Sequence, residues 1–347
     1  MKYLELYNVL RKSIEDGVYS YGEKLPSKRT CADKYGVSVI TVVHALELLS
    51  DEGYVASLER SGYFVIYKAG KTSKIPALPA PTVKKVDFVK VEDFPFSSFA
   101  KTMRRVITEY AERILSKTDG FGSMELRKEL SRYLARAKGM DAPAERIVIG
   151  AGAEYLYTLA VIFFGKDSVF ALEEPSYRQI ERVYRSHGVV CDMLKLEHDG
   201  INSQALAKTK AKILHVSPYR SYPSGVAASA NKRLEYIRWV KGGDRYIIED
   251  DCESEFSKKP AQSLYSLAKG EGVIYINTFA KTMSPAMRMA YMVLPEAIFA
   301  EFEKKLGFYS CTVPAFEQFV MAEFIKNGDF ERHINKIRRK SKKTIDK

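Results

Sequence analysis

The chain has 347 residues, 46% of them hydrophobic and 12% aromatic, which is enough for at least two domains with a large core. No run approaches the roughly 18 apolar residues of a membrane span, and the N-terminus lacks the apolar region of a signal peptide, so we expect a globular, soluble, cytoplasmic protein with no membrane partner. Its four cysteines are far apart and show no paired spacing, which favours reduced thiols and predicts neither a metal site nor a disulfide framework.

The formal net charge of +12 is unevenly distributed along the chain. Residues 1–70 hold nine Lys or Arg and nine Asp or Glu, whereas residues 331–347 hold eight basic and two acidic residues, a net charge of +6. Half of the positive excess therefore lies at the C-terminal end. Net charge alone is weak support for nucleic-acid binding, and any such prediction must come from local sequence patterns.

The first 50 residues show the pattern of three helices separated by tight turns. Apolar side chains at helical spacing predict a helix over residues 3–17. Ser27 can cap a short second helix, Gly36 can end it in a tight turn, and Ser38 can cap a third helix that runs to Ser50. This order is typical of a helix-turn-helix.

Two β-rich runs, residues 54–58 and 63–67, flank a turn and predict a hairpin wing. The same region contains the sequences Leu-Pro-Ser-x-Arg, Gly-Val-Ser-x-x-Thr-Val and Ser-Gly-x-x-Val. Together these features resemble the GntR-type winged helix-turn-helix, which implies a DNA-binding domain over residues 1–69. By this resemblance double-stranded operator DNA would be bound by Ser27 and Arg29 at phosphates, Ser38 and Thr41 at the entry to the major groove, and Arg60 and Gly62 on the wing.

One position departs from that family pattern, because Val39 stands where arginine is common. The change removes one contact to a base or to the DNA backbone. The alternative interpretation of residues 1–67 is a helical protein-interaction domain, in which the Ser and Arg side chains only cap helices and contact water.

Residues 70–86 are polar and proline-rich without periodicity, which predicts an exposed, semi-rigid linker. A second domain is expected over residues 87–347. In it, helical patterns alternate with short β-branched runs, which predicts an α/β fold with a mostly parallel sheet and helices on both faces. In such folds ligands gather at the carboxyl ends of the strands. The runs are residues 146–149, 168–172, 212–216, 246–248 and 273–276.

Lys281 lies just past the apolar run 272–277, and Arg288 follows seven positions later. This pair suits an aldehyde cofactor that carries a phosphate, because the amine can form a Schiff base and the guanidinium fork can bind the phosphate. By itself the pattern fits a surface loop with two ordinary cations equally well.

Other strand ends add the remaining parts of such a site. The loop at Gly152 precedes a helix whose free amides suit a phosphate. Tyr177 lies on a proline-set turn, where an aromatic face can cover a cofactor ring. The carboxylate cluster of residues 249–251 can keep a pyridinium nitrogen protonated. Each residue alone has an ordinary structural alternative, but their combination favours a cofactor site.

This order resembles the fold-type I pyridoxal-phosphate aminotransferases, and the fusion to a GntR-like domain resembles the MocR-type regulators over essentially the whole chain. The resemblance implies pyridoxal 5'-phosphate as the cofactor and a homodimer. Lys281 would be the catalytic residue that forms the Schiff base, Asp250 would pair with the ring nitrogen, and Tyr177 would stack on the ring. The cofactor phosphate would be held by Thr278, Arg288, Gly152, Ala153 and Glu154, and Tyr222 starts the turn that occupies the aminotransferase Asn-Pro-x-Gly place.

Four departures from the family weaken the catalytic interpretation more than the binding one. Cys252, Ala280, Ala290 and the pair Arg220-Ser221 stand where the family has Tyr, Ser, Gly and His-Gln. Each lost hydrogen bond to the cofactor would cost roughly 0.5–1.5 kcal/mol. The chain also stops at Lys347, before the small subdomain whose arginine binds the substrate carboxylate in aminotransferases. Either the chain is a C-terminally incomplete fragment or this member lacks that subdomain.

Three functions are compatible with the sequence. The leading one is a homodimeric transcriptional regulator that binds operator DNA and senses pyridoxal phosphate or an amino-acid-like effector, with at most residual transaminase chemistry. The second is an active pyridoxal-phosphate-dependent aminotransferase. The third is a structural homodimer whose cofactor site is vestigial.

Overall fold

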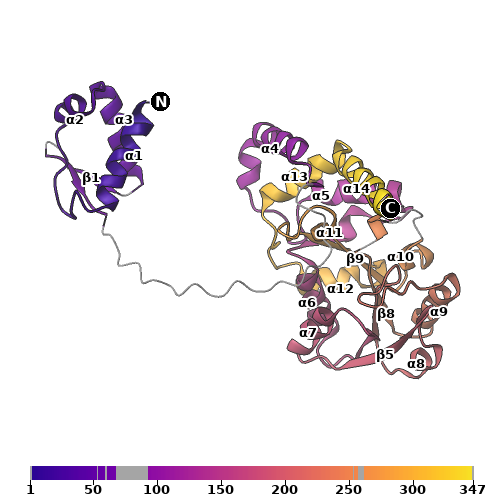
Figure 1. Ribbon diagram of the computed structural model, residues 1–347. Helices are drawn as coiled ribbons and strands as arrows, with labels where there is room; N and C mark the ends of the chain where they lie inside the picture. The colour runs from indigo at the N-terminus through magenta and orange to yellow at the C-terminus, as the bar shows by residue number, and fades with distance from the viewer. Residues whose placement is uncertain are drawn as a thin grey trace. The chain divides into compact units, whose positions relative to one another are not determined.

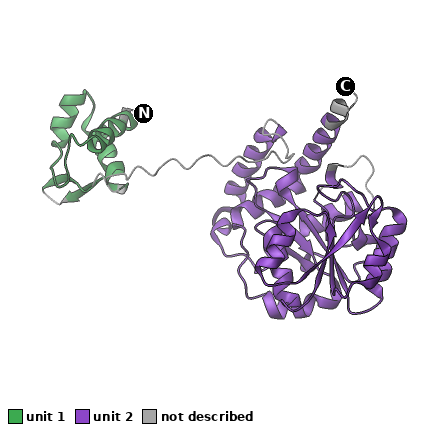
Figure 2. Cartoon of the chain, turned by 60° about the horizontal axis from the view of Figure 1, so that its bottom comes forward, with its two compact units in different colours: residues 1–83 green, residues 84–347 purple. Residues whose placement is uncertain are grey.

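The chain folds into two compact units, residues 1–83 and 84–347 (Figure 2). The computed structural model describes residues 2–52, 54–58, 61–67, 93–252, 254–256 and 262–345. The predicted linker, the two domain boundaries beside it and the wing residue Arg60 lie outside the described residues, so they stay predictions.

Unit 1 contains the three helices and the hairpin that the sequence predicts (Figure 1). Ser27 Oγ accepts a hydrogen bond from the Thr30 amide, and Ser38 Oγ accepts one from the Thr41 amide, each at 3.2 Å, so both serines cap helices. Gly36 has a φ of 62°, a left-handed conformation that favours glycine. The elements are α1 (Lys2–Glu15), α2 (Lys28–Tyr35), α3 (Val39–Asp51), β1 (Val55–Leu58) and β2 (Gly62–Val65), and the two strands pair antiparallel.

Unit 2 is an α/β domain built on one eight-stranded sheet. None of the helices among the described residues is long and apolar enough to cross a membrane. The helices are α4 (Phe96–Tyr110), α5 (Met124–Lys138), α6 (Ala153–Phe164), α7 (Arg178–Ser186), α8 (Ser203–Lys208), α9 (Ala230–Lys241), α10 (Leu264–Leu267), α11 (Phe279–Thr282), α12 (Glu296–Leu306), α13 (Ala315–Lys326) and α14 (Asp329–Ile345), with short 3-10 turns at η2 (Ala111–Leu115), η3 (Ala144–Arg146) and η4 (Ser254–Phe256). The strands are β3 (Ile147–Gly150), β4 (Phe170–Glu174), β5 (Cys191–Glu197), β6 (Gly200–Ile201), β7 (Ile213–Val216), β8 (Tyr246–Asp250), β9 (Val273–Thr278) and β10 (Ala290–Val293).

The strand order is β3-β10-β9-β8-β7-β4-β5-β6. Strands β9, β8, β7, β4 and β5 pair parallel, whereas β10 runs antiparallel to both of its neighbours and β6 runs antiparallel to β5. The five apolar runs in the sequence are all strands, and the prediction of a mostly parallel sheet is confirmed. The sequence did not indicate β5, β6 or β10, because β5 is only half-buried, β6 has two residues, and β10 contains a single β-branched residue, Val293.

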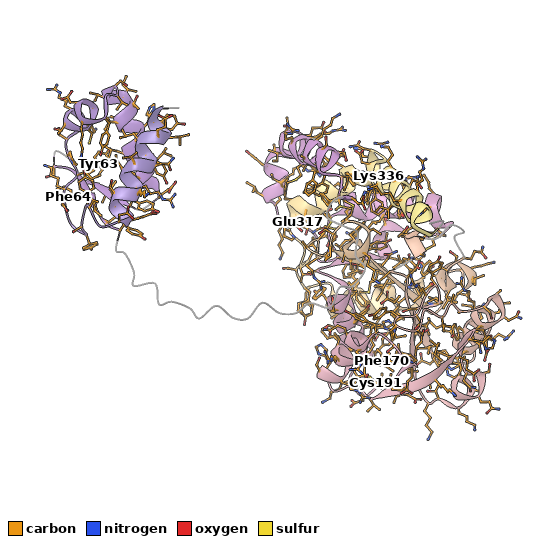
Figure 3. The ribbon with its side chains drawn as sticks, in the orientation of Figure 1. Tyr63, Phe64, Phe170, Cys191, Glu317 and Lys336 are labelled. Atoms are coloured by element: carbon orange, nitrogen blue, oxygen red, sulfur yellow. The ribbon has the colours of Figure 1, made fainter. Side chains whose placement is uncertain are left out.

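Helices cover both faces of the sheet and form a separate apolar core on each. Along β9, Val273 and Tyr275 enter the core beneath α5, α9, α10, α13 and α14, whereas Ile274 and Ile276 enter the core beneath α6, α7 and α12. Figure 1 shows α6 and α7 on the opposite side of the strands from α9. On neighbouring strands Phe170 and Cys191 are register partners and lie side by side (Figure 3). Burial on both faces explains the continuous apolar runs in the sequence.

A substitution in the core of unit 1 should leave unit 2 intact. Leu46 of α3 is completely buried among Leu10, Val42 and Leu49, so Leu46→Ala should cost about 2–5 kcal/mol of unfolding free energy. The only tryptophan, Trp239, lies in unit 2. We therefore expect the unfolding transition of unit 1, followed by circular dichroism, to shift to lower denaturant while the Trp239 fluorescence transition stays in place. A parallel shift of both transitions would show that the two units unfold together.

Candidate functional site

The antiparallel strand β10 brings the predicted phosphate-binding segments together at one edge of the sheet. Ala290, its first residue, is the register partner of Gly150 on one side and of Thr278 on the other. Because β3 and β9 both run antiparallel to β10, their carboxyl ends lie at the same edge. Arg288, two residues before β10, therefore lies between the loop that follows β3 and the end of β9.

The loop after β3 forms a cradle of backbone around Gly152. Its φ of 96° is a conformation that favours glycine, and a Cβ placed on it would lie 2.6 Å from Arg288 Nη2, which would have to move. Helix α6 begins at Ala153 without a side-chain cap, which leaves its first amides for an anion. Arg288 Nη2 lies 2.6 Å from Glu154 Oε2. The structure thus gathers Gly152, Ala153, Glu154 and Arg288.

Thr278 ties the end of β9 to the segment that carries Arg288. Its Oγ1 accepts a hydrogen bond from the Ala280 amide at 3.1 Å and donates one to the Met289 carbonyl at 3.2 Å. Thr278 is buried and caps the short helix α11, which holds Lys281 in a half-buried position directly after β9. The hydroxyl therefore fixes the lysine-bearing helix relative to the arginine.

Asp250, the last residue of β8, is buried within a shell of polar side chains. Tyr157 Oη of α6 donates to Oδ2, and Cys252 Sγ lies 2.6 Å from Oδ1. His215 Nε2 faces Oδ2 at 3.6 Å. Burial by itself would raise the pKa of the Asp250 carboxyl, but His215, Cys252 and Tyr157 together lower it below its ordinary value. The shell keeps this buried carboxylate ionised, as a partner for a protonated ring nitrogen requires.

Lys281 and Cys252 influence each other electrostatically. Burial raises the pKa of the Cys252 thiol well above its ordinary value, the nearby Asp250 carboxylate adds to this, and the Lys281 ammonium opposes it.

The sequence prediction missed Tyr157 and His215, the two deeper partners of Asp250. Tyr184 Oη and His215 Nδ1 lie 2.7 Å apart, which orients the imidazole. Within the described part of the chain, His215 Nε2 is buried without a hydrogen-bond partner and faces Asp250. A histidine inside the apolar run 212–216 was the one signal in the sequence for this role.

The prediction that residues 249–251 form one carboxylate cluster is wrong. Glu249 accepts hydrogen bonds from the amides of Leu264 and Tyr265 at 2.8 and 2.9 Å, and Asp251 lies 2.8 Å from Lys138 Nζ. Successive side chains of a strand point to opposite faces. Only Asp250 therefore faces α6, and the side chains of its two neighbours lie on the opposite face of the sheet.

Two tyrosines lie exposed at the loops after β4 and β7. Tyr177 and Tyr222 are 46% and 53% exposed, and their rings meet edge to face with centroids 5.8 Å apart. The structure brings these two predicted residues together on the surface of the unit. The Tyr177 ring is thus available for contact with a bound molecule.

The predicted DNA-binding residues that the structure describes lie at the starts of α2 and α3 and at the start of β2. Arg29 is exposed, and Thr41 Oγ1 lies 2.9 Å from Ser38 Oγ at the start of α3. Gly62 has a φ of 110° and begins β2. Val39 and Ile40, 42% and 69% exposed, add an aliphatic surface at the first turn of α3.

Two family models match the chain. Residues 2–65 match bacterial regulatory proteins of the gntR family, and residues 91–347 match aminotransferase class I and II. A mixed sheet between two helical layers, preceded by a winged helix-turn-helix, defines a protein of the MocR type. The chain belongs to the aminotransferase class I and II family.

Two similar regulators align with nearly the whole chain, and a solved aminotransferase aligns with part of it. The uncharacterized HTH-type transcriptional regulator YdeL of Bacillus subtilis is 29% identical, over 97% of this chain and 76% of its own length. MocR of Rhizobium meliloti, described as a probable rhizopine catabolism regulatory protein, is 26% identical over 96% of this chain and 74% of its own. The solved kynurenine aminotransferase of Pyrococcus horikoshii superposes with a TM-score of 0.66 at 23% identity. The superposition covers 73% of this chain and 65% of that structure.

Glu173 is a second buried carboxyl behind the candidate site. Its Oε2 accepts hydrogen bonds from Ser221 Oγ at 2.7 Å and from the Ser217 amide at 3.3 Å. Ser221 is one of the positions that depart from the family pattern. Burial raises the pKa of Glu173 to about 7, against the two hydrogen bonds, which lower it.

This carboxyl should make the stability of unit 2 depend on pH. Because its pKa is higher in the folded than in the unfolded chain, its contribution is complete below pH 4.5 and is lost as the pH rises through about 7. We expect Glu173→Gln to reduce the fall in unfolding free energy between pH 5 and 8 by roughly 2 to 3 kcal/mol, measured by Trp239 fluorescence. Glu181→Gln, on the exposed face of α7, is the control. Identical pH profiles for wild type and Glu173→Gln would contradict the assignment.

Proposed function

We propose that this protein is a homodimeric transcriptional regulator that binds operator DNA through unit 1 and senses pyridoxal phosphate, or an amino compound bound with it, through unit 2. The observation that carries the proposal is the cradle of Gly152 and Arg288 beside the lysine-bearing helix α11, in a chain that begins with a gntR-type unit. One winged domain reads a single half-site, which favours a dimer on a symmetric or repeated operator.

The residues of unit 2 fit pyridoxal phosphate in charge and position. A Cβ on Gly152 would fill the cradle beneath Arg288, so the backbone there can approach a phosphate closely. When bound, the cofactor supplies an aldehyde that condenses with amines and a ring that withdraws electrons. Lys281 offers the amine, and Asp250 can hold the proton of the ring nitrogen. Tyr177 can cover the ring face.

The departures from the aminotransferase pattern favour sensing over turnover. The Cys252 thiol is directed at Asp250, and the Ser221 hydroxyl donates a hydrogen bond to Glu173. The thiol does not replace the hydrogen bond that the phenol of the family's Tyr would provide to the cofactor. Affinity tolerates such losses better than catalysis does, because rate depends on the positioning of the substrate. The aminotransferase alternative is favoured by the complete set of Lys281, Asp250 and Arg288.

DNA binding should separate into two kinds of contact. Arg29→Ala should weaken binding by the same factor on operator and unrelated DNA, and it should reduce the salt slope by about 1, because it removes a phosphate contact. Thr41→Ala keeps the Ser38 cap and should lower the specificity ratio instead, by roughly 1–3 kcal/mol if a base contact is lost. Mobility-shift titrations at fixed salt measure both, with Lys12→Ala as the charge control. The assigned DNA face is wrong if neither variant differs from wild type.

Cofactor binding should depend on Lys281 and lead to little turnover. Wild-type protein with pyridoxal phosphate should show a visible absorption band that Lys281→Ala abolishes, since the band requires the lysine amine. Added amino acid should leave the cofactor in its aldehyde oxidation state, as judged by the same spectrum. Rapid, complete conversion to the amine form would establish the aminotransferase alternative, and a band that survives in Lys281→Ala would remove the lysine from its assigned role.

A further inference from the structure

The cradle already holds an anion that belongs to the protein. Glu154 Oε2 lies 2.6 Å from Arg288 Nη2. A Cβ on Gly152 would lie 2.6 Å from that nitrogen and 3.2 Å from that oxygen, so the ion pair sits directly above the glycine backbone. This is the space in which the phosphate of the proposed cofactor would be bound.

The carboxylate and a phosphate require the same partners. Glu154 is the second residue of α6, where the helix dipole stabilises a negative charge. Arg288 has one guanidinium for either anion, and two anions within a few ångströms of each other repel. Both side chains are partly exposed, so water moderates this repulsion without removing it. A phosphate must therefore displace Glu154 from Arg288, or bind beside it at a cost.

We propose that Glu154 is a built-in competitor for the phosphate and sets the concentration at which the site fills. The inference rests on the proposed function of unit 2 as a pyridoxal-phosphate sensor. The competition weakens the contribution of the phosphate to affinity and leaves contacts to the rest of the cofactor unchanged. Glu154 thus determines how strongly the site distinguishes pyridoxal phosphate from pyridoxal, which lacks the phosphate.

The test is Glu154→Gln in the full chain, because the amide keeps the size of the side chain and removes its charge. We expect the variant to bind pyridoxal phosphate about tenfold more tightly, equivalent to about 1.4 kcal/mol, and to bind pyridoxal as wild type does. Glu181→Gln is the matched control, because Glu181 also pairs with an arginine, Arg185, at 2.7 Å on an exposed helix face. It should change neither affinity.

Absorbance and fluorescence titrations with each compound measure the affinities, and thermal unfolding with and without inorganic phosphate gives a readout that needs no cofactor. Phosphate should raise the melting temperature of Glu154→Gln more than that of wild type or Glu181→Gln. Equal pyridoxal-phosphate affinities in wild type and Glu154→Gln, with a band that still requires Lys281, would overturn this inference and leave the sensor proposal standing. Weaker binding by Glu154→Gln would make Glu154 a ligand and also overturn it. Absence of a Lys281-dependent band in every variant would overturn both.

Discussion

The backbone pairing on the two sides of β10 is the constraint on which the candidate site depends. Because Ala290 is in register with both Gly150 and Thr278, the start of α6, the lysine-bearing α11 and Arg288 must meet at one point of the sheet edge. Hydrogen bonds between main-chain groups set this placement, and the Thr278 hydroxyl then fixes α11 relative to Arg288. The identities of individual side chains can therefore vary around the cradle while its geometry is kept. This freedom explains how a member of an enzyme family can depart at Cys252 and Ala280 and retain the frame of the site.

The buried carboxyl groups of unit 2 have separate partners and do not form one common cluster. Asp250 is kept ionised by the side chains around it, whereas Glu173, two strands away in the sheet, retains its proton to near neutral pH. The difference arises from neighbours, because both carboxyls are buried and only Asp250 faces an imidazole. The ring nitrogen of the proposed cofactor would therefore meet one carboxylate, whereas the second holds the loop at Ser217 and Ser221.

The sequence predicted those features that follow from local rules. Helix caps at Ser27 and Ser38, and the fully buried strands β7, β8 and β9, have signatures in adjacent residues, and strand ends pointed to Lys281 and Asp250. Strand β10 was not predicted because it contains only one β-branched residue, whereas β3 and β7, of the same length, contain three and two. It nevertheless determines where Arg288 lies. Tyr157 and His215 were not predicted, because their role depends on how α6 and β7 pack against β8. That packing leaves no pattern of residue spacing in the sequence. The grouping of residues 249–251 failed because it ignored the alternation of strand side chains. The winged unit was more predictable, since its parts are contiguous in the chain.

The alternation of side chains along β8 also restricts which insertions and deletions the strand can tolerate. Glu249 meets the start of α10, Asp250 meets α6 on the other face, and Asp251 meets Lys138 of α5, so each carboxylate has a different partner. Deleting or inserting one residue within the strand would turn Asp251 toward His215 and leave Glu255 as the remaining carboxylate beside the buried ammonium of Lys138. Such a change would damage both faces of the sheet at once, whereas the exposed turn at 242–244 just before the strand can absorb it. We therefore expect length differences among related chains to fall in that turn and the spacing from Tyr246 to Asp251 to be invariant.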